Sequence, residues 1–144
     1  DKQQAHIRKQ IIGYDKFDWN IDNLELVGAV MSASWEVLEW ACAGLVIYSM
    51  KSKKIIYEDY IYVILKEEYI PGFLAFRELP PTLELFRKLK ADKPHLWPQV
   101  VLVDGNGILH KFQCGYACHL GVILDIPTIG CAKTFFDVDG LHQN

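Results

Sequence analysis

The first half of the chain carries hydrophobic residues in short runs of the kind that form β-strands. Three such runs occupy residues 24–31, 41–49 and 54–65, and the third is rich in Ile, Tyr and Val. The run at 41–49 is apolar at nearly every position, which is typical of a central strand. A polar turn joins it to the third run, which is interrupted by the acidic pair Glu58 and Asp59. We therefore predict an antiparallel meander of three strands.

The second half changes to a helical period. Phe and Leu residues recur at helical spacing over residues 71–90, but Pro80 and Pro81 stand in the middle of this pattern. Because proline is tolerated in the first turn of a helix and not in its interior, we predict a short helix, a break, and a longer helix whose first turn holds Pro81.

The remaining expected elements are short. They are a helix at residues 1–12, a loop at 13–23, a strand at 100–103, a helix at 115–125 and a strand at 126–132. Strands first, and then alternating helices and strands, predict an α/β fold with a mixed sheet and helices on its faces.

Length and composition point to one globular domain over residues 1–144. The chain is 51% hydrophobic and 23% charged, which excludes disorder. No apolar run approaches the ~20 residues of a membrane span, and no signal peptide is visible. We expect an intracellular protein of the cytoplasm or nucleus. Because the chain ends without a closing element, we also expect the C-terminal part of the domain to be missing.

Charge and cysteine content add little. The net charge of −3 and the pI near 5.9 give no overall footprint for nucleic acid, although a local basic cluster would suffice. We expect the four cysteines to be buried, reduced thiols. The run Cys114, Cys118 and His119 does not have the spacing of a common zinc site.

The segment 101–110 carries the strongest chemical signal. A run of apolar residues leads directly into Asp104, which is followed by Gly105, Gly107 and His110. A carboxylate at the end of a buried strand is costly unless it is paired or bound to metal, and nearby glycines let a ligand approach the backbone. The pattern predicts a metal-binding acid at a sheet edge, and the alternative is an aspartate that caps a turn.

Four segments resemble the endonuclease V family of the ribonuclease-H-like superfamily. They lie at residues 69–78 (YIPGFLAFRE), 102–110 (LVDGNGILH), 115–121 (GYACHLG) and 127–133 (PTIGCAK). The resemblance implies a ribonuclease-H-like mixed sheet flanked by helices. It also implies cleavage of RNA or single-stranded DNA one linkage 3′ to an inosine.

The resemblance assigns catalytic roles position by position. Glu78 and Asp104 match metal-binding carboxylates, and Mg²⁺ is the implied cofactor, with Mn²⁺ as a substitute. Lys133 matches a lysine held near the scissile phosphate, and His110 is grouped with the catalytic residues. Each has a structural alternative: Glu78 as a solvated partner of Arg77, Lys133 as an ordinary exposed lysine, and His110 as a structural histidine.

The resemblance also assigns contacts to nucleic acid. A wedge beside the target base is implied for Tyr69, Ile70, Pro71 and Gly72, and a pocket for the flipped-out base is implied for Gly105, Gly107, Gly115, His119 and Gly121. Such a pocket must be tight and reached over bare backbone, which glycines allow. The alternative for Tyr69 is packing, and for His119 it is a place in the core.

One departure from the family pattern concerns the metal site. The first strand of the family ends in an aspartate, but here that position is Met31, or Val30 under a different gap. A thioether is a soft, neutral donor and an alkyl group is none, so neither ligates a hard cation. Glu36 or Glu39 would have to reach back as a replacement.

Two hypotheses follow. In the first, the chain is a Mg²⁺-dependent, inosine-directed endonuclease whose catalysis is impaired at Met31. In the second, it is a non-catalytic inosine- or RNA-binding module, or a structural subunit, with a protein partner over the side left open by the missing C-terminal part.

Overall fold

The computed structural model describes residues 2–35, 40–64, 74–108, 110 and 113–133, without the side chains of residues 4, 34, 35 and 74–78. The strands are β1 (Leu26–Trp35), β2 (Trp40–Ser49), β3 (Lys54–Ile64), β4 (Val100–Val103) and β5 (Thr128–Gly130). The helices are α1 (Lys2–Arg8), α2 (Leu74–Asp92), the single 3₁₀ turn η1 (Pro94–Leu96) and α3 (Tyr116–Leu124).

The strands form one mixed sheet in the order β3-β2-β1-β4-β5. Strands β1, β2 and β3 are antiparallel to one another, as the predicted meander requires. Strand β4 joins β1 in parallel, and β5 joins β4 in parallel. The α/β class and the mixed sheet predicted from the sequence are therefore confirmed.

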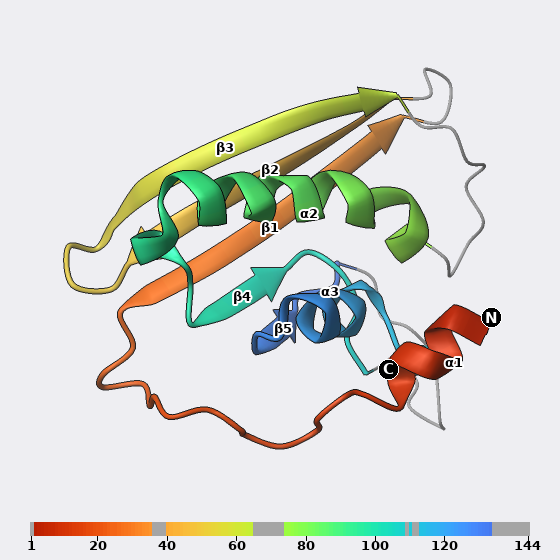
Figure 1. Ribbon diagram of the computed structural model, residues 1–144, viewed down its shortest axis with the longest axis horizontal. Helices are drawn as coiled ribbons and strands as arrows, with labels where there is room; N and C mark the ends of the chain where they lie inside the picture. Colours follow the sequence, from red (N-terminus) through yellow and green to blue (C-terminus); the bar gives the residue numbers. More distant parts are fainter. Residues whose placement is uncertain (1, 36–39, 65–73, 109, 111–112, 134–144) are drawn as a thin grey trace.

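Helices α2 and α3 cover the same face of this sheet (Figure 1). The covered face of β2 carries Ala43, Leu45 and Ile47, and all three are fully buried. Strand β4 adds Val101 and Val103 to the same core. The alternation of buried and half-buried positions along β2 accounts for its uniformly apolar sequence, since small and aliphatic residues occupy both faces.

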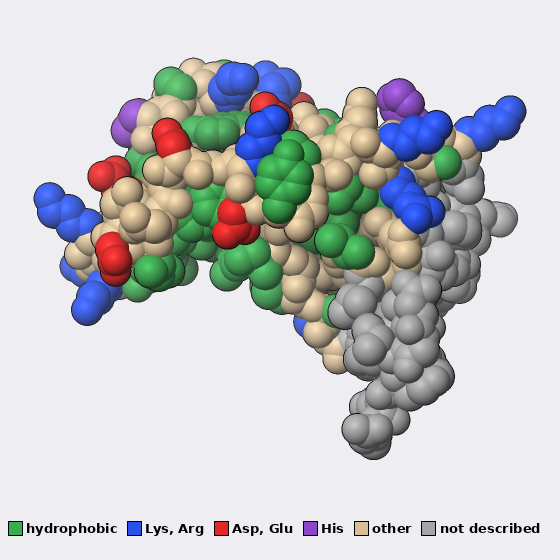
Figure 2. All heavy atoms as spheres, turned by 90° about the horizontal axis from the view of Figure 1, so that it is seen from below, with side chains coloured by type: hydrophobic (Ala, Val, Ile, Leu, Met, Phe, Trp, Pro, Cys, Tyr) green, Lys and Arg blue, Asp and Glu red, His purple; other side chains and the backbone are tan. Residues whose placement is uncertain are grey.

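The opposite face of the sheet bears exposed hydrophobic side chains. They are Met31, Trp40, Tyr60, Tyr62, Ile64, Leu102 and Ile129. Seen from below, the molecule has a hollowed side along which hydrophobic side chains gather (Figure 2). Among the described residues, therefore, helices shield only one face of the sheet.

The predicted break at the prolines is wrong, because α2 runs through Pro80 and Pro81 without interruption. Proline removes a backbone hydrogen bond and disfavours the helix interior. The tertiary packing overrides this preference: Leu79, Thr82 and Leu85 keep helical spacing across the prolines and are all buried. The helix continues because one unbroken face of it lies on the sheet.

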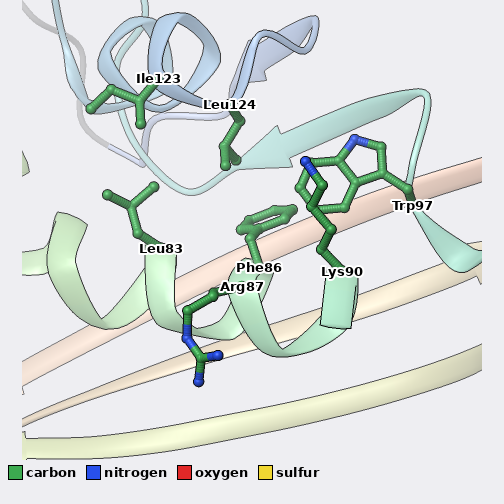
Figure 3. A pocket seen from close by; sticks show the side chains of 7 residues that line it. All are labelled: Leu83, Phe86, Arg87, Lys90, Trp97, Ile123 and Leu124. Atoms are coloured by element: carbon green, nitrogen blue, oxygen red, sulfur yellow. The ribbon is translucent and has the colours of Figure 1, made fainter. Parts of the chain in front are cut away.

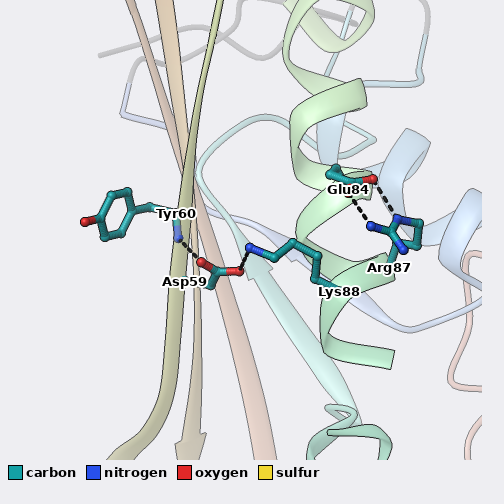
Figure 4. A network of polar contacts seen from close by, with 5 residues as sticks. All are labelled: Asp59, Tyr60, Glu84, Arg87 and Lys88. Atoms are coloured by element: carbon teal, nitrogen blue, oxygen red, sulfur yellow. Dashed lines mark hydrogen bonds and ion pairs between the residues drawn. The ribbon is translucent and has the colours of Figure 1, made fainter. Parts of the chain in front are cut away.

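The acidic pair in β3 also finds an explanation. Asp59 lies on the side of β3 that faces α2. Its carboxylate forms an ion pair with Lys88, with Asp59 Oδ2 2.7 Å from Lys88 Nζ (Figure 4). This contact raises the pKa of Lys88, through its hydrogen bond to Asp59. A register shift between Ile47 and Tyr48 of β2 marks a bulge in the same strand pair. The acid therefore joins the sheet to the helix instead of ending the strand.

Smaller differences concern the last strand and the cysteines. Strand β5 is shorter than the predicted 126–132. All four cysteines are free thiols, but only Cys114 is buried, Cys42 and Cys118 are half-buried, and Cys131 is exposed. The expectation that all four are buried is thus confirmed only for Cys114, and it fails most clearly for Cys131, which lies just beyond a short strand at the edge of the sheet. No helix in the described part is both long and apolar enough to cross a bilayer.

Candidate active site at the edge of the sheet

The site begins where β4 ends beside β1. Val103 lies opposite Val30 in the parallel register, and the Asp104 N–H donates to the Val30 carbonyl at 3.2 Å. Continuing this register places Asp104 beside Met31, at the strand spacing of about 4.8 Å. The position expected to hold a second carboxylate is thus adjacent to Asp104, and Met31 occupies it with 60% of its surface exposed.

Lys133 is the second charged residue that the structure describes at this edge. The Cys131 N–H donates to the Val103 carbonyl at 2.7 Å, and the Gly105 N–H donates to the Cys131 carbonyl at 3.3 Å. These two bonds extend the β4–β5 pairing and bring the end of β5 to Asp104. Lys133 Nζ lies 3.0 Å from Asp104 Oδ2, so two of the residues predicted for catalysis form an ion pair.

The glycine loop after Asp104 is held against the start of α3. The Gly115 N–H donates to the Gly107 carbonyl at 2.9 Å, and the Ala117 N–H donates to the Asn106 carbonyl at 3.0 Å. Gly115 is the N-cap of α3 and has no side chain to cap the helix, so loop carbonyls satisfy its first amides. These two hydrogen bonds hold the loop that follows Asp104 against α3.

A buried hydroxyl pair joins this loop to α2. The Tyr116 hydroxyl donates to Thr82 Oγ1 at 2.5 Å, and a Cβ at Gly105 would lie 3.3 Å from Tyr116 Cβ. Thr82 follows Glu78 by four residues, which is one helical turn, on the buried side of α2. Glu78 thus lies one helical turn before this contact in α2, and its side chain is outside the described atoms.

Two further predicted residues lie in the interior, and a third allows close packing of α3 on a strand. His119 is fully buried and His110 is nearly so. A Cβ at Gly121 would lie 2.7 Å from Thr128 Oγ1, so this glycine allows α3 to approach β5. These positions favour packing roles, as the alternative for His119 anticipated, and their contact with a base stays a prediction. The predicted wedge at residues 69–72, and Glu36 and Glu39, lie outside the described residues.

Sequence reasoning missed two contributors to the site. A Cβ at Gly130 would lie 2.6 Å from the Gly105 carbonyl oxygen and 2.7 Å from the Gly107 amide nitrogen, so only glycine allows β5 to support the loop. The other is the Thr82–Tyr116 pair. A glycine inside the fourth matching segment was an available signal for Gly130, whereas nothing in the sequence pairs residue 82 with residue 116.

A shallow pocket lies elsewhere on the helix-covered side. It has a volume of about 210 Å³ and is lined by Leu83, Phe86, Arg87, Lys90, Trp97, Ile123 and Leu124 (Figure 3). Lys90 Nζ lies over the Trp97 ring, 5.7 Å from its centroid. None of the residues predicted for the site lines this pocket, so it is separate from the edge that holds Asp104.

Burial shifts the protonation of groups in α3. Desolvation lowers the pKa of His119, and desolvation with the neighbouring Cys114 raises the pKa of Cys118 to about 11. At neutral pH, both side chains are therefore held in their uncharged forms.

The free energy of unfolding should fall as the pH is lowered below about 6.5, because the unfolded chain then protonates His119 while the folded chain resists. Stability from this residue is thus present above the unfolded pKa and is lost towards acid. Urea unfolding at pH 7.5 and 5.5 measures the effect. His119→Leu should lose less stability between these pH values than the parent does. An equal loss in His119→Leu and the parent would contradict the assignment.

The fold and site together define a ribonuclease-H-like α/β protein with an acidic residue at the edge of its central strands. Comparison with known proteins identifies the family within this class. The family profile of endonuclease V matches residues 5–143. The chain belongs to the endonuclease V family.

Individual relatives agree. Endonuclease V of Mus musculus is 45% identical, over 99% of this chain and 44% of its own length, and that of Homo sapiens is 43% identical, over 99% of this chain and 52% of its own. A crystal structure of the human protein superposes with a TM-score of 0.91 at 42% identity, covering 99% of this chain and 61% of that one. The chain thus spans about half the length of these relatives.

A further relative was solved with nucleic acid. The structure of Ciona intestinalis endonuclease V, in complex with a 24mer DNA that contains an inosine followed by a ribo-adenosine, superposes with a TM-score of 0.88 at 36% identity. It covers 99% of this chain and 60% of that one. The endonuclease V family is one of metal-dependent nucleases, and inosine-containing DNA is bound by this member.

Proposed function

We propose that this chain acts on inosine-containing RNA or single-stranded DNA and cleaves the strand one linkage 3′ to the inosine, with a rate reduced by Met31. The observation that carries the proposal is the ion pair of Asp104 and Lys133 beside a glycine loop. These residues come from two of the four segments that resemble the family, and the fold brings them together at one edge.

The loop supports recognition of a base. Gly105, Asn106 and Gly107 are all partly exposed, and their backbone is fixed by α3 and by Gly130. An extruded base is read through its edges in a pocket of fixed shape, and a glycine backbone lets it approach closely. We therefore assign the base to this loop, with Gly107 as a candidate contact, because a Cβ there would meet only Cys118 Sγ, at 3.8 Å.

Lys133 supports contact with the strand itself. Its side chain is 74% exposed, whereas the carboxylate of Asp104 is only 21% exposed. An exposed ammonium can meet a phosphate oxygen, and such contacts position a strand without reading its sequence. Lys133 is thus the described residue that orients a phosphate next to the glycine loop.

The described donors do not fit the Mg²⁺ or Mn²⁺ that the resemblance implies. Mg²⁺ takes oxygen ligands in octahedral geometry, and Asp104 is the one carboxylate that the described atoms place at this edge. Met31 beside it offers only a thioether. The described side chains at this edge therefore do not by themselves make a site for a hard divalent cation.

A second candidate function is favoured by the same register. With Met31 at the edge, the chain would be a non-catalytic module that binds inosine-containing RNA or serves as a structural subunit. The two functions differ in a simple way: a binding module prefers an inosine-containing strand to its adenosine counterpart without cutting it, and a structural subunit shows no preference.

The deciding experiment is a single-turnover cleavage assay on a single-stranded RNA with one inosine, with Mg²⁺ or Mn²⁺ supplied. We expect slow cleavage beside the inosine by the parent, and cleavage at least about 100-fold faster by Met31→Asp, since losing even an outer support of a metal site costs 10–100-fold. Met31→Asn is the matched control, because it has the same shape without the charge.

The same RNA with adenosine in place of inosine is the control for selectivity. The affinity of the chain for both strands is measured in parallel with cleavage. Inosine-selective binding without cleavage by any variant would favour the binding module. Equal affinity for the two strands, with no selective cleavage, would exclude both inosine-directed functions.

A further inference from the structure

Three neighbouring strands present one row of residues at the edge of the sheet. The register pairs Val30 with Val103 and Val103 with Gly130, so the next residues along the three strands are Met31, Asp104 and Cys131. The Asp104 N–H bonds to β1 and the Cys131 N–H bonds to β4, which carries this register past the last paired residues. Asp104 is therefore flanked on both sides by sulfur-containing residues.

The charge of this row is already balanced. Asp104 is partly buried, and a lone carboxylate there needs a positive partner. Lys133 Nζ supplies one at 3.0 Å. A single ammonium neutralises a single carboxylate, so a divalent cation at this place would have to displace Lys133 and would gain one oxygen-donor side chain from the row.

The donor atoms of the row also argue against a hard divalent cation at this place. A hard divalent cation binds through several oxygens, whereas thioether and thiol groups favour soft ions. Among the described residues, no three His, Cys, Asp or Glu side chains are grouped to hold a metal ion. Met31 is also exposed among the described residues and lies outside the buried core, so none of the described packing requires a methionine there.

We infer that Lys133 serves in this chain as the counter-ion of Asp104 in place of a divalent cation, and that the identity of residue 31 decides between the two. A carboxylate at position 31 adds a second negative charge and a second oxygen donor about one strand spacing from Asp104. Lys133 then neutralises only half of the charge, and because it is largely exposed it can move aside. The inference rests on the register of the sheet and not on the proposed cleavage.

The test measures Mn²⁺ binding directly, by titration calorimetry and by the electron paramagnetic resonance of free Mn²⁺, on the full chain without nucleic acid. We expect the parent and Met31→Asn to bind Mn²⁺ weakly and Met31→Asp to bind at least about tenfold more tightly. Adding Asp104→Asn to Met31→Asp should abolish the gain. Circular dichroism shows that each variant is folded.

A second variant tests the role of Lys133. Lys133→Gln removes the counter-ion and leaves Asp104 in place, so we expect it to bind Mn²⁺ more tightly than the parent. A lysine with a merely structural role would not change the affinity in this direction. Lys90→Gln, a change of the same kind at a lysine distant from the row, is the matched control and should leave the affinity at the parent's value.

Two results would overturn the inference. One is tight Mn²⁺ binding by the parent that is lost in Asp104→Asn; if it is also lost in Glu36→Gln/Glu39→Gln, then these carboxylates replace the acid at position 31. The other is a folded Met31→Asp with no gain in affinity. The cleavage assay can fail while the Mn²⁺ results hold, and cleavage can be observed while the Mn²⁺ results fail. The inference and the proposed function are therefore tested separately.

Discussion

Phe86→Ala is expected to lower the free energy of unfolding by about 3–5 kcal/mol, because it removes a large side chain of α2 from the buried core. Phe86 is 1% exposed, and its ring meets Trp97 edge to face, with centroids 5.5 Å apart. The cost combines the lost burial of a large aromatic side chain with the cavity that remains. Urea unfolding followed by far-ultraviolet circular dichroism measures it.

The matched control is Arg87→Ala, one residue further along α2. Arg87 is exposed and its ion pair with Glu84 is an i,i+3 contact on the helix surface, with Arg87 Nη2 2.5 Å from Glu84 Oε1. Such exposed pairs contribute less than about 1 kcal/mol. A loss in Phe86→Ala no larger than that of Arg87→Ala would show that α2 does not depend on this core for its place on the sheet.

The strands were predictable from sequence because their signal is local. Alternation and β-branched content at residues 41–49 and 54–65 depend on neighbours within the same run. The course of α2 was not predictable in this way, since Pro80 and Pro81 argue locally for a break and only contact with the sheet reverses the outcome. The same holds for Asp59, whose partner Lys88 lies in a different element.

The candidate site divides along the same line. Asp104 could be predicted from its neighbours in the sequence, because an acid that follows a buried strand needs a partner in any fold. The resemblance singled out Lys133 as a contact for phosphate and not as the partner of Asp104; their ion pair emerged only from the structure, because no local pattern links the end of β4 to the end of β5. The support from Gly130 and the Thr82–Tyr116 bond depends on three-dimensional contact, and the sequence carried no pairwise signal for it.

Gly115→Ala is expected to destabilise the chain by about 3 kcal/mol or more and to displace the Asp104 loop, because the added Cβ has no room. It would lie 2.2 Å from the Asn106 carbonyl oxygen and 2.9 Å from that of Gly107, and backbone atoms cannot turn aside as a flexible side chain does. The backbone of Gly115, at φ −79° and ψ −175°, is extended and suits alanine. The contact alone therefore carries the cost, and urea unfolding measures it.

Gly107→Ala provides the matched control in the same loop. Its added Cβ would meet only Cys118 Sγ, at an ordinary 3.8 Å, so the free energy of unfolding should change by less than about 1 kcal/mol. Because we place the flipped base at this loop, the same variant should nevertheless bind inosine-containing RNA more weakly than the parent. If Gly115→Ala is as stable as Gly107→Ala, the close packing of the loop on α3 is wrong, and with it the support of the loop on which the proposed base recognition depends.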